Sequence, residues 1–324
     1  MSKLQLLIPQ YSETDDIIKP MLDSIAMQLN VNLKEDIEVI IGNDGSDTKL
    51  SNEFLKKYEF PIQYKTFEHA RLAGCRKNLF DISSAEYVMF CDADDAFAST
   101  VALSMIFKEM ENKYDAIVCD YVEEHKPDAK ELYAFRTNES VHVHGKVYRR
   151  QYLIDNEIQW NPNLYENQDS AFNVVALNLT KNTKVIDKPL YLWHYNPESI
   201  CRKDGRMHGV HTWKRMIESY DSIVVDLRDR GFGDKARYYA TNCLYATYYE
   251  LARDIWDEEE AIPYKLEVCK SLSDFYKKHH LLILYMNDEK SIKHMEEISR
   301  KQAERKGKLD LRVPFKKWMD SIVN

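Results

Sequence analysis

The first 120 residues alternate short apolar segments with longer amphipathic ones, and this alternation limits the fold more than any other feature of the sequence. Short apolar runs are typical of strands buried in a sheet, and apolar residues three and four positions apart are typical of helices that cover one. Strands separated by helices form a mostly parallel sheet with right-handed crossovers. The expected strands are 4–8, 37–41, 62–67, 87–91 and 116–119, and the expected helices are 15–29, 70–82 and 100–111. The sequence therefore predicts an α/β fold with flanking helices.

Polar loops follow three of the expected strands. Pro9 is expected to end the first strand, the second strand ends in the loop 43–46, and the fourth runs directly into 92–95. Ligands of parallel α/β sheets bind at the carboxyl ends of the strands. We therefore expect these loops to meet at one edge of the sheet and to form the binding site.

The loop after the fourth strand reads Asp-Ala-Asp-Asp, from Asp92 to Asp95. Its three carboxylates repel one another unless a cation is present. Oxygen ligands of this kind suit Mg²⁺ or Mn²⁺, and magnesium commonly shares its shell with phosphate oxygens, so a nucleoside diphosphate is a natural co-ligand. The alternative is a surface turn in which Asp95 caps the following helix.

The pattern changes after about residue 205, where long helical segments replace the alternation. They cover 211–230, 234–256 and 263–282. We expect two domains, an α/β domain over 1–205 and a helical C-terminal domain over 206–324.

The last segment, 290–324, carries ten basic and five acidic side chains, a net charge of +5, whereas the rest of the chain carries −13. This asymmetry indicates a contact with a membrane surface, an anionic polymer or a partner. The alternatives are a solvated helical face, or packing of Phe315 and Trp318 onto the helical domain.

Composition and missing motifs argue against several classes of function. The net charge of −8 and the pI of about 5.8 argue against non-specific nucleic-acid binding. The sequence has no signal peptide, no apolar run near the roughly 18 residues of a membrane span, no P-loop and no Gly-x-Gly-x-x-Gly motif. The six cysteines form no Cys-x-x-Cys pair, which favours free thiols. We expect a cytoplasmic protein, with a peripheral contact at the cytoplasmic face of the membrane as an option.

Seven segments, taken in order, make the chain similar to glycosyltransferase family 2, whose members are inverting enzymes with a Rossmann-type GT-A fold. The segments are 6–11, 38–46, 76–77, 90–95, 144–149, 165–172 and 189–200. Two positions depart from the family pattern, because Lys77 stands where the family has Asn and Gln168 where it has Glu. The resemblance covers about residues 4–205.

The resemblance implies a nucleotide-sugar donor, usually UDP-linked, and Mn²⁺ or Mg²⁺ as cofactor. The implied donor-binding residues are Pro9, Tyr11, Glu13, Asp44, Arg76, Asp92 and Ala93. The implied metal ligands are Asp94 and His194, and the implied catalytic base is Asp169. The transferred group would be a hexosyl or N-acetylhexosaminyl group, and the acceptor a polysaccharide, a teichoic acid or another hydroxyl-bearing polymer.

Several residue assignments have rivals in the sequence. Asp169 could simply cap the helix 169–179, and Glu166 is the other candidate base. His194 could be a structural histidine, and His208 and His211 compete for its role. His142 and His144 alternate on an expected strand, and we interpret one or both as structural.

Two other functions remain open at this point. A nucleotidyltransferase also uses paired carboxylates and a metal ion, but the loop 9–14 lacks the basic residues that hold a triphosphate. A non-catalytic nucleotide-sugar-binding module would explain the departures at Lys77 and Gln168. Retention of Asp44, Asp92, Asp94 and Asp169 together argues against such a module.

Overall fold

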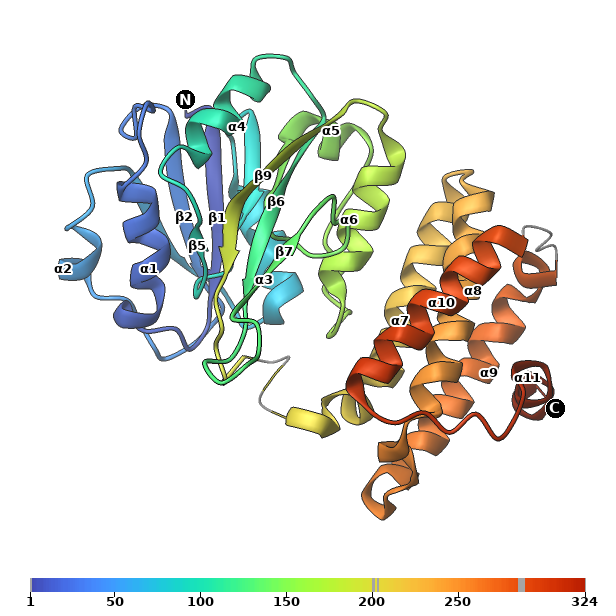
Figure 1. The fold of residues 1–324 in the computed structure, drawn as a ribbon. Coiled ribbons are helices and arrows are strands. Elements are labelled where there is room, and N and C mark those ends of the chain that lie inside the picture. Colours follow the sequence, from blue (N-terminus) through green and yellow to red (C-terminus); the bar gives the residue numbers. More distant parts are fainter. Residues whose placement is uncertain (1, 200–201, 203, 285–288, 324) are drawn as a thin grey trace. The chain divides into compact units, whose positions relative to one another are not determined.

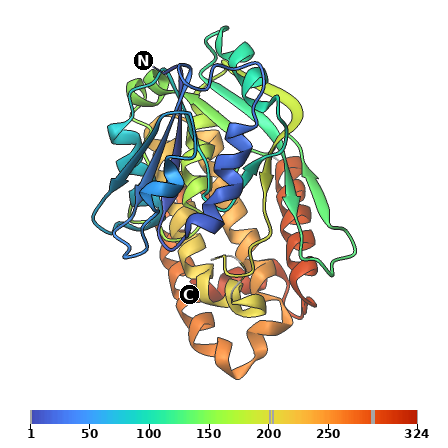
Figure 2. The ribbon, with the colours of Figure 1, turned by 90° about the vertical axis from the view of Figure 1, so that its left-hand side faces the viewer.

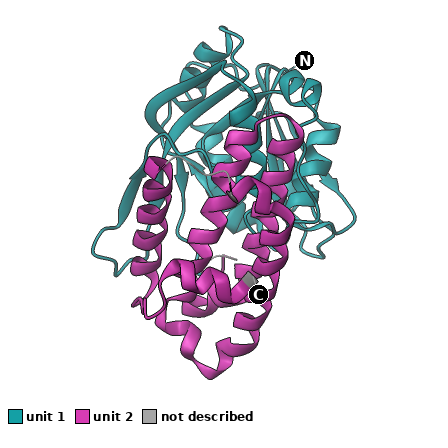
Figure 3. Cartoon of the chain, turned by 90° about the vertical axis from the view of Figure 1, so that its right-hand side faces the viewer, with its two compact units in different colours: residues 1–197 teal, residues 198–324 magenta. Residues whose placement is uncertain are grey.

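The structure, a computed structural model, describes residues 2–199, 202, 204–284 and 289–323 (Figure 1). The chain divides into two compact units, 1–197 and 198–324 (Figure 3). The five described cysteines are free thiols, whereas Cys201 and Ile200 lie outside the described residues.

Unit 1 contains one mixed sheet. Its strands are β1 (Leu4–Gln10), β2 (Ile37–Asn43), β3 (Ile62–Thr66), β4 (Tyr87–Phe90), β5 (Ala96–Phe97), β6 (Ala116–Glu124), β7 (Tyr133–Arg136), β8 (Lys146–Arg149) and β9 (Thr183–Trp193). Their order is β3-β2-β1-β4-β8-β6-β9-β5. Strands β1 to β4 are parallel, β8 lies antiparallel between β4 and β6, and β9 is parallel to β6. The predicted mostly parallel α/β sheet with flanking helices is therefore confirmed.

Strand β7 lies off the main path and pairs only with the distal part of β6. The resulting hairpin extends away from the rest of the sheet (Figure 2). The alternation that predicted the parallel strands did not indicate this hairpin or the antiparallel insertion of β8.

Helices flank both faces of the sheet. They are α1 (Asp15–Ala26), α2 (Asn52–Leu55), α3 (Arg71–Ile82), α4 (Ala102–Met110), α5 (Arg150–Asp155) and α6 (Gln168–Leu179). Helices α1 and α4 share one apolar core with alternate residues of β1, β2 and β4. Helix α6 covers the opposite face, where its Phe172 meets Phe90 of β4 at a ring-centroid distance of 5.7 Å.

Pro9 does not end the first strand, so that expectation is wrong. Strand β1 pairs with β2 as far as Gln10 and Asn43, but with β4 only as far as Leu7. The carbonyl of Leu7 accepts the Cys91 N–H on the β4 side, and Pro9, two residues later, would direct an N–H to that same side. Since pairing with β4 has already ended there, the missing N–H of proline costs the sheet nothing.

Unit 2 is helical in its described residues. Its α-helices are α7 (His208–Asp229), α8 (Gly233–Leu251), α9 (Ile262–Leu284), α10 (Glu289–Lys306) and α11 (Phe315–Val323). The predicted helical C-terminal region is therefore confirmed. In the part of the chain that the structure describes, no helix combines the length and apolar character needed to cross a bilayer.

The aromatic residues of the basic tail pack inside unit 2. Phe315 stacks on Tyr245 of α8 with ring centroids 4.2 Å apart, and Trp318 lies 5.1 Å from Tyr248. Both rings are partly buried against Tyr248 and Tyr249, and Met319 of the same helix is buried. The packing alternative for Phe315 and Trp318 therefore holds, and these side chains are not free to enter a membrane surface.

Candidate functional site

The loops after β1, β2 and β4 meet at one edge of the sheet. The Asp44 N–H donates to the Gln10 carbonyl at 2.8 Å, which joins the ends of β2 and β1. Glu13, in the loop after β1, lies close enough to the loop after β4 for the charges of that loop to shift its pKa. Burial, together with the charges of Asp94 and Asp92, raises the pKa of Glu13. The carboxyl ends of the strands thus form a common acidic edge, as expected for an α/β ligand site.

Tyr191 of β9 fixes the Asp92–Asp95 loop. Its hydroxyl accepts the Asp92 N–H at 3.0 Å and donates to Asp95 Oδ2 at 2.8 Å. The other oxygen of Asp95 accepts the His194 N–H at 3.0 Å. Asp95 is fully buried and does not cap the next helix, so that alternative for Asp95 is wrong. Its carboxylate instead fastens the loop to β9.

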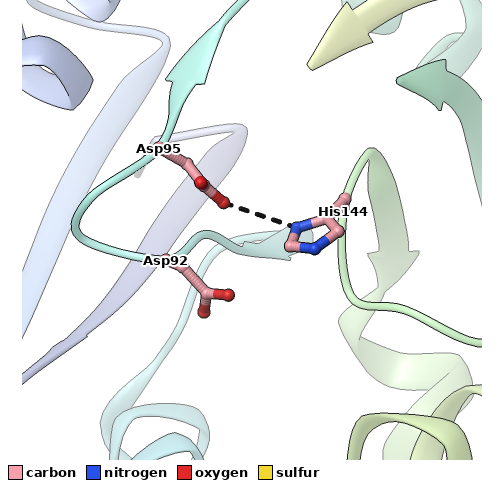
Figure 4. Close-up of side chains that lie close together, drawn as sticks. All are labelled: Asp92, Asp95 and His144. Atoms are coloured by element: carbon pink, nitrogen blue, oxygen red, sulfur yellow. Dashed lines mark ion pairs between the residues drawn. The ribbon is translucent and has the colours of Figure 1, made fainter. Parts of the chain in front are cut away.

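His144 completes a group of possible metal ligands with Asp92 and Asp95. The ligand atoms of the three residues lie within 4.8 Å of one another. The Asp95 carboxylate points toward the His144 ring, with Oδ2 3.4 Å from Nδ1 (Figure 4). His144 is 4% exposed, and its Nδ1 atom has no hydrogen-bond partner among the described residues. Two carboxylates and one imidazole are a donor set that suits Mn²⁺.

Burial and like charge control protonation in this group. Burial and the charges of Asp92 and Asp94 raise the pKa of Asp95, and burial raises the pKa of Asp94. Burial also lowers the pKa of His144 to about 4, so the ring is neutral at physiological pH and keeps a lone pair for a cation. Asp92 differs: burial opposes its ionisation, but the charge and hydrogen bond of Arg76, together with His144 and His142, lower its pKa. The loop therefore holds more acidic groups than the one arginine balances.

Neither Asp94 nor His194 belongs to this group of ligands. Asp94 accepts a hydrogen bond from Asn196 at 2.8 Å, and Nδ1 of His194 lies 3.0 Å from Glu124 Oε2. The sequence offered a helix cap as the alternative role for Asp95, and it placed His142 and His144 on a strand, with one or both as structural residues. His144 in fact lies with His142 in the turn before β8, where the two rings stack 5.8 Å apart. One local signal was available, since His144 is the first residue of the segment 144–149 that resembles the family.

Most residues assigned to the donor lie at or after the ends of β1, β2 and β4, and Arg76 lies in α3. Tyr11 is half-exposed, and its N–H donates to Glu13 Oε2 at 2.6 Å. Arg76 is buried, donates to Asp92 and stands over the Trp160 ring, with Cζ 4.9 Å from its centroid. Pro9, Ala93 and Asp44 are buried around them.

Asp169 is the second residue of α6, and Asn167 rather than Asp169 occupies the N-cap position. One oxygen of Asp169 accepts the N–H of Ser170 at 2.8 Å. Its charge acts on His142, His144 and the buried Lys146, which indicates that Asp169 lies near the His144 side of the site. Glu166, the rival base, lies in the loop that precedes α6 and is half-buried.

Comparisons with known proteins agree with this geometry. The sequence pattern of glycosyl transferase family 2 matches residues 6–171, about half of the chain. The chain therefore belongs to glycosyl transferase family 2 and has its GT-A fold. It is 22% identical over 220 residues to the uncharacterized glycosyltransferase EpsJ of Bacillus subtilis, in a match covering 61% of this chain and 62% of EpsJ. The chain thus spans less than two thirds of that relative.

Solved structures of two proteins share the fold. TarS 1–349 of S. aureus in complex with UDP has a TM-score of 0.63 and 17% identity, covering 94% of this chain and 90% of that one. The same TarS fragment has also been solved in complex with UDP-GlcNAc. Mannosyltransferase PcManGT of Pyrobaculum calidifontis, in complex with GDP-Man and Mn²⁺, has a TM-score of 0.52 and 11% identity, covering 94% of this chain and 86% of that one.

Proposed function

We propose that this chain is a metal-dependent, inverting glycosyltransferase that moves an N-acetylhexosaminyl or hexosyl group from a UDP-sugar to an acceptor hydroxyl. The observation that carries the proposal is the surplus of carboxylates at the ligand-binding edge, with the unpartnered Nδ1 of buried His144 among them. Buried like charges are costly without a cation, and a nucleoside diphosphate is the ligand that such a cation binds in turn. TarS in complex with UDP-GlcNAc makes that sugar the first donor to test.

Two ligand sets are open to the cation. The family resemblance implies Asp94 and His194, whereas the geometry favours Asp92, Asp95 and His144, whose donor atoms are already close together. When bound, Mn²⁺ or Mg²⁺ supplies positive charge that stabilises the departing diphosphate. Arg76 holds Asp92 in its ionised form, and Tyr191 fixes the loop that carries both aspartates.

Asp169 is our candidate for the general base. An acceptor hydroxyl has a pKa far above 7, so its proton must leave as the new glycosidic bond forms, and a carboxylate can take it. Attack from the face opposite the diphosphate inverts the configuration at the anomeric carbon. Asp169 acts electrostatically on His142 and His144, which favours it over Glu166 for this role.

The decisive experiment measures nucleotide release from a panel of donors, without acceptor and then with candidate glycan acceptors. The panel contains UDP-GlcNAc, UDP-glucose, UDP-galactose and GDP-mannose, each with Mn²⁺, Mg²⁺ or EDTA. We expect metal-dependent release of UDP, fastest from UDP-GlcNAc. Binding of the UDP-sugars without release from any of them, in the presence of every acceptor tried, would leave a binding module as the function.

The two ligand sets are separated by the gain in UDP affinity that Mn²⁺ produces over EDTA. We expect Asp95→Asn and His144→Gln to remove most of this gain and His194→Gln to retain it. Asp94→Asn, which changes the neighbouring carboxylate, is the matched control. Loss of the gain in Asp94→Asn and His194→Gln alone would assign the cation to the pair implied by the resemblance.

The acceptor side of the proposal rests on charge. Lys316 and Lys317 remain exposed in the basic tail, although its aromatic residues are packed. These lysines suit an anionic acceptor such as a teichoic acid, or a membrane surface at the cytoplasmic face. We propose a cytoplasmic enzyme that meets its polymeric acceptor partly through residues 290–324.

A further inference from the structure

The segment 307–314, which we call the strap, joins α10 to α11 (Figure 1). Hydrogen bonds hold its backbone against α8 and the residue after that helix. The Asp310 N–H donates to the Ala252 carbonyl at 2.6 Å, and the Tyr248 hydroxyl donates to the Val313 carbonyl at 3.0 Å. The backbone of the strap is therefore fixed to unit 2, which sets where its side chains are presented.

Two large apolar side chains of the strap are exposed to solvent. Leu311 is 45% exposed and Val313 is 43% exposed. Leu309 and Phe315, which lie before and after them in the chain, instead pack against the buried tyrosines of α8. A single exposed apolar side chain is ordinary on a protein surface. A pair of them on a fixed backbone, within a run of basic residues, is the feature from which we infer a contact.

Basic side chains flank the exposed pair on both sides. Residues 308–317 carry four bases and one acid, a net charge of +3. The acid, Asp310, forms an ion pair with Arg312. One lysine lies three residues before Leu311 and another three residues after Val313, so the reach of the chain places each within about 11 Å of the pair. In the part of the chain that the structure describes, three exposed bases of this run form no ion pair, and these are Lys308, Lys316 and Lys317.

We propose that Leu311, Val313 and these lysines form a peripheral contact with a bilayer that contains anionic phospholipids. At such a surface, apolar side chains enter the boundary between headgroups and acyl chains, and lysines reach the phosphate groups with their charged ends. A dissolved anionic polymer would engage the charges and leave the apolar pair in water, so the exposed pair favours a bilayer. The inference rests on the acceptor side of the proposed function, because it chooses between the two surfaces named there.

The experiment measures binding of the full chain to vesicles and to a soluble anionic polymer, without donor or metal. The vesicles contain phosphatidylcholine alone or an equal mixture with phosphatidylglycerol, and the polymer is polyphosphate. We expect binding to the mixed vesicles that weakens as salt rises, and no binding to phosphatidylcholine alone. The double variant Leu311→Ser with Val313→Ser should lose roughly tenfold in affinity for the mixed vesicles and keep whatever affinity the unaltered chain has for polyphosphate.

Leu266→Ser is the matched control, because this residue of α9 is 68% exposed and lies outside the basic run. It should bind the mixed vesicles as tightly as the unaltered chain does. Urea unfolding should show the same midpoint for the unaltered chain and the double variant, since both replaced side chains are exposed.

Three results would overturn the inference. Equal vesicle affinity of the double variant and the unaltered chain would show that the apolar pair does not enter the bilayer. Binding to polyphosphate but not to the mixed vesicles would identify the partner as an anionic polymer. A dimer of the unaltered chain in light scattering that the double variant does not form would show that the pair covers a second copy. None of these measurements involves the donor site, so each leaves the proposed transferase activity intact, and failure of nucleotide release would leave the bilayer contact standing.

Discussion

The two units of the chain bury charge in different ways. In unit 1, Asp92 and Asp95 adjoin a neutral His144, and among the described residues Arg76 of α3 forms an ion pair with Asp92. Among the described residues of unit 2, the buried acid is Glu250, and it has a base beside it. Glu250 and Arg253 are 2% and 3% exposed and form an ion pair, and Arg253 also donates to the Lys306 carbonyl at 3.0 Å.

The difference distinguishes a candidate ligand-binding site in unit 1 from a structural ion pair in unit 2. A balanced buried pair satisfies its own charges and fixes the elements that carry it, here the end of α8 and the end of α10. A surplus of one sign is stable only if something else neutralises it. The surplus lies at the carboxyl ends of the strands in unit 1, which is where we place the cation and the nucleotide. Four predictions test this comparison.

The largest effect is expected from the catalytic base. Asp169→Asn retains the size of the side chain but cannot accept a proton, so kcat should fall by roughly 10²–10⁴ while the affinity for UDP stays nearly unchanged. Steady-state kinetics with the donor found in the panel and calorimetry with UDP measure the two quantities. Glu166→Gln is the control, and if it shows the loss while Asp169→Asn does not, Glu166 is the base.

We expect the buried ion pair of Glu250 and Arg253 in unit 2 to contribute to the free energy of unfolding. Arg253→Met leaves Glu250 buried without its base, which should reduce the free energy of unfolding by about 3–5 kcal/mol. Urea unfolding followed by circular dichroism measures the change. The double variant Glu250→Gln with Arg253→Met should be less destabilised than Arg253→Met alone, because no unpaired charge is left. If the free energy of unfolding of Arg253→Met lay within about 1 kcal/mol of that of the unaltered protein, the ion pair would not have the structural role we assign to it.

Glu139 in unit 1 offers a pH-dependent comparison. Although burial opposes its ionisation, His142 and Lys146 lower the pKa of Glu139 to about 2, below its ordinary value of 4.5. Its carboxylate lies 3.2 Å from the buried Lys146 amine. A lowered carboxylate pKa stabilises the fold above the unfolded pKa, and this contribution is lost as pH falls through the folded pKa.

Glu139→Gln should therefore reduce the free energy of unfolding by about 2 kcal/mol at pH 7. The difference from the unaltered protein should shrink as pH falls from about 4.5 toward 2. Urea unfolding across that pH range measures it, with Glu131→Gln on the exposed hairpin loop as the control. A difference independent of pH would show that Glu139 contributes through packing alone.

The smallest stability effect is expected at the exposed charges of the tail. Lys316→Gln with Lys317→Gln should change the free energy of unfolding by less than about 0.5 kcal/mol, since both side chains are exposed. Phe315→Ala should cost about 1–3 kcal/mol, because it removes the ring stacked on Tyr245. The lysine variant should also bind anionic polymer or vesicles more weakly at low salt. Unchanged binding of the lysine variant would remove the tail from the acceptor surface.

Local pattern predicted the parallel half of the sheet and the loops that carry its chemistry. Apolar runs such as 37–41 appear within β2 (Ile37–Asn43), because a strand buried on both faces leaves few polar choices. The Asp92–Asp95 loop was predicted from the sequence as well, since three carboxylates within four residues are conspicuous in any sequence. The local pattern wrongly predicted that Pro9 ends the first strand. The effect of this proline depends on where β4 stops pairing with β1.

By itself, the sequence determined the fold class, the ligand-binding edge and the acidic loop on it. Only the tertiary structure decided that Asp95 and His144, 49 positions apart, face each other, and that His69 covers Asp44. These pairs form because β8 enters the sheet antiparallel beside β4, and because Gly45 lets the segment before α3 approach β2. Periodicity reports which face of its own element a residue occupies. Which residue meets it across the sheet edge depends on strand order and loop closure, which no local pattern encodes.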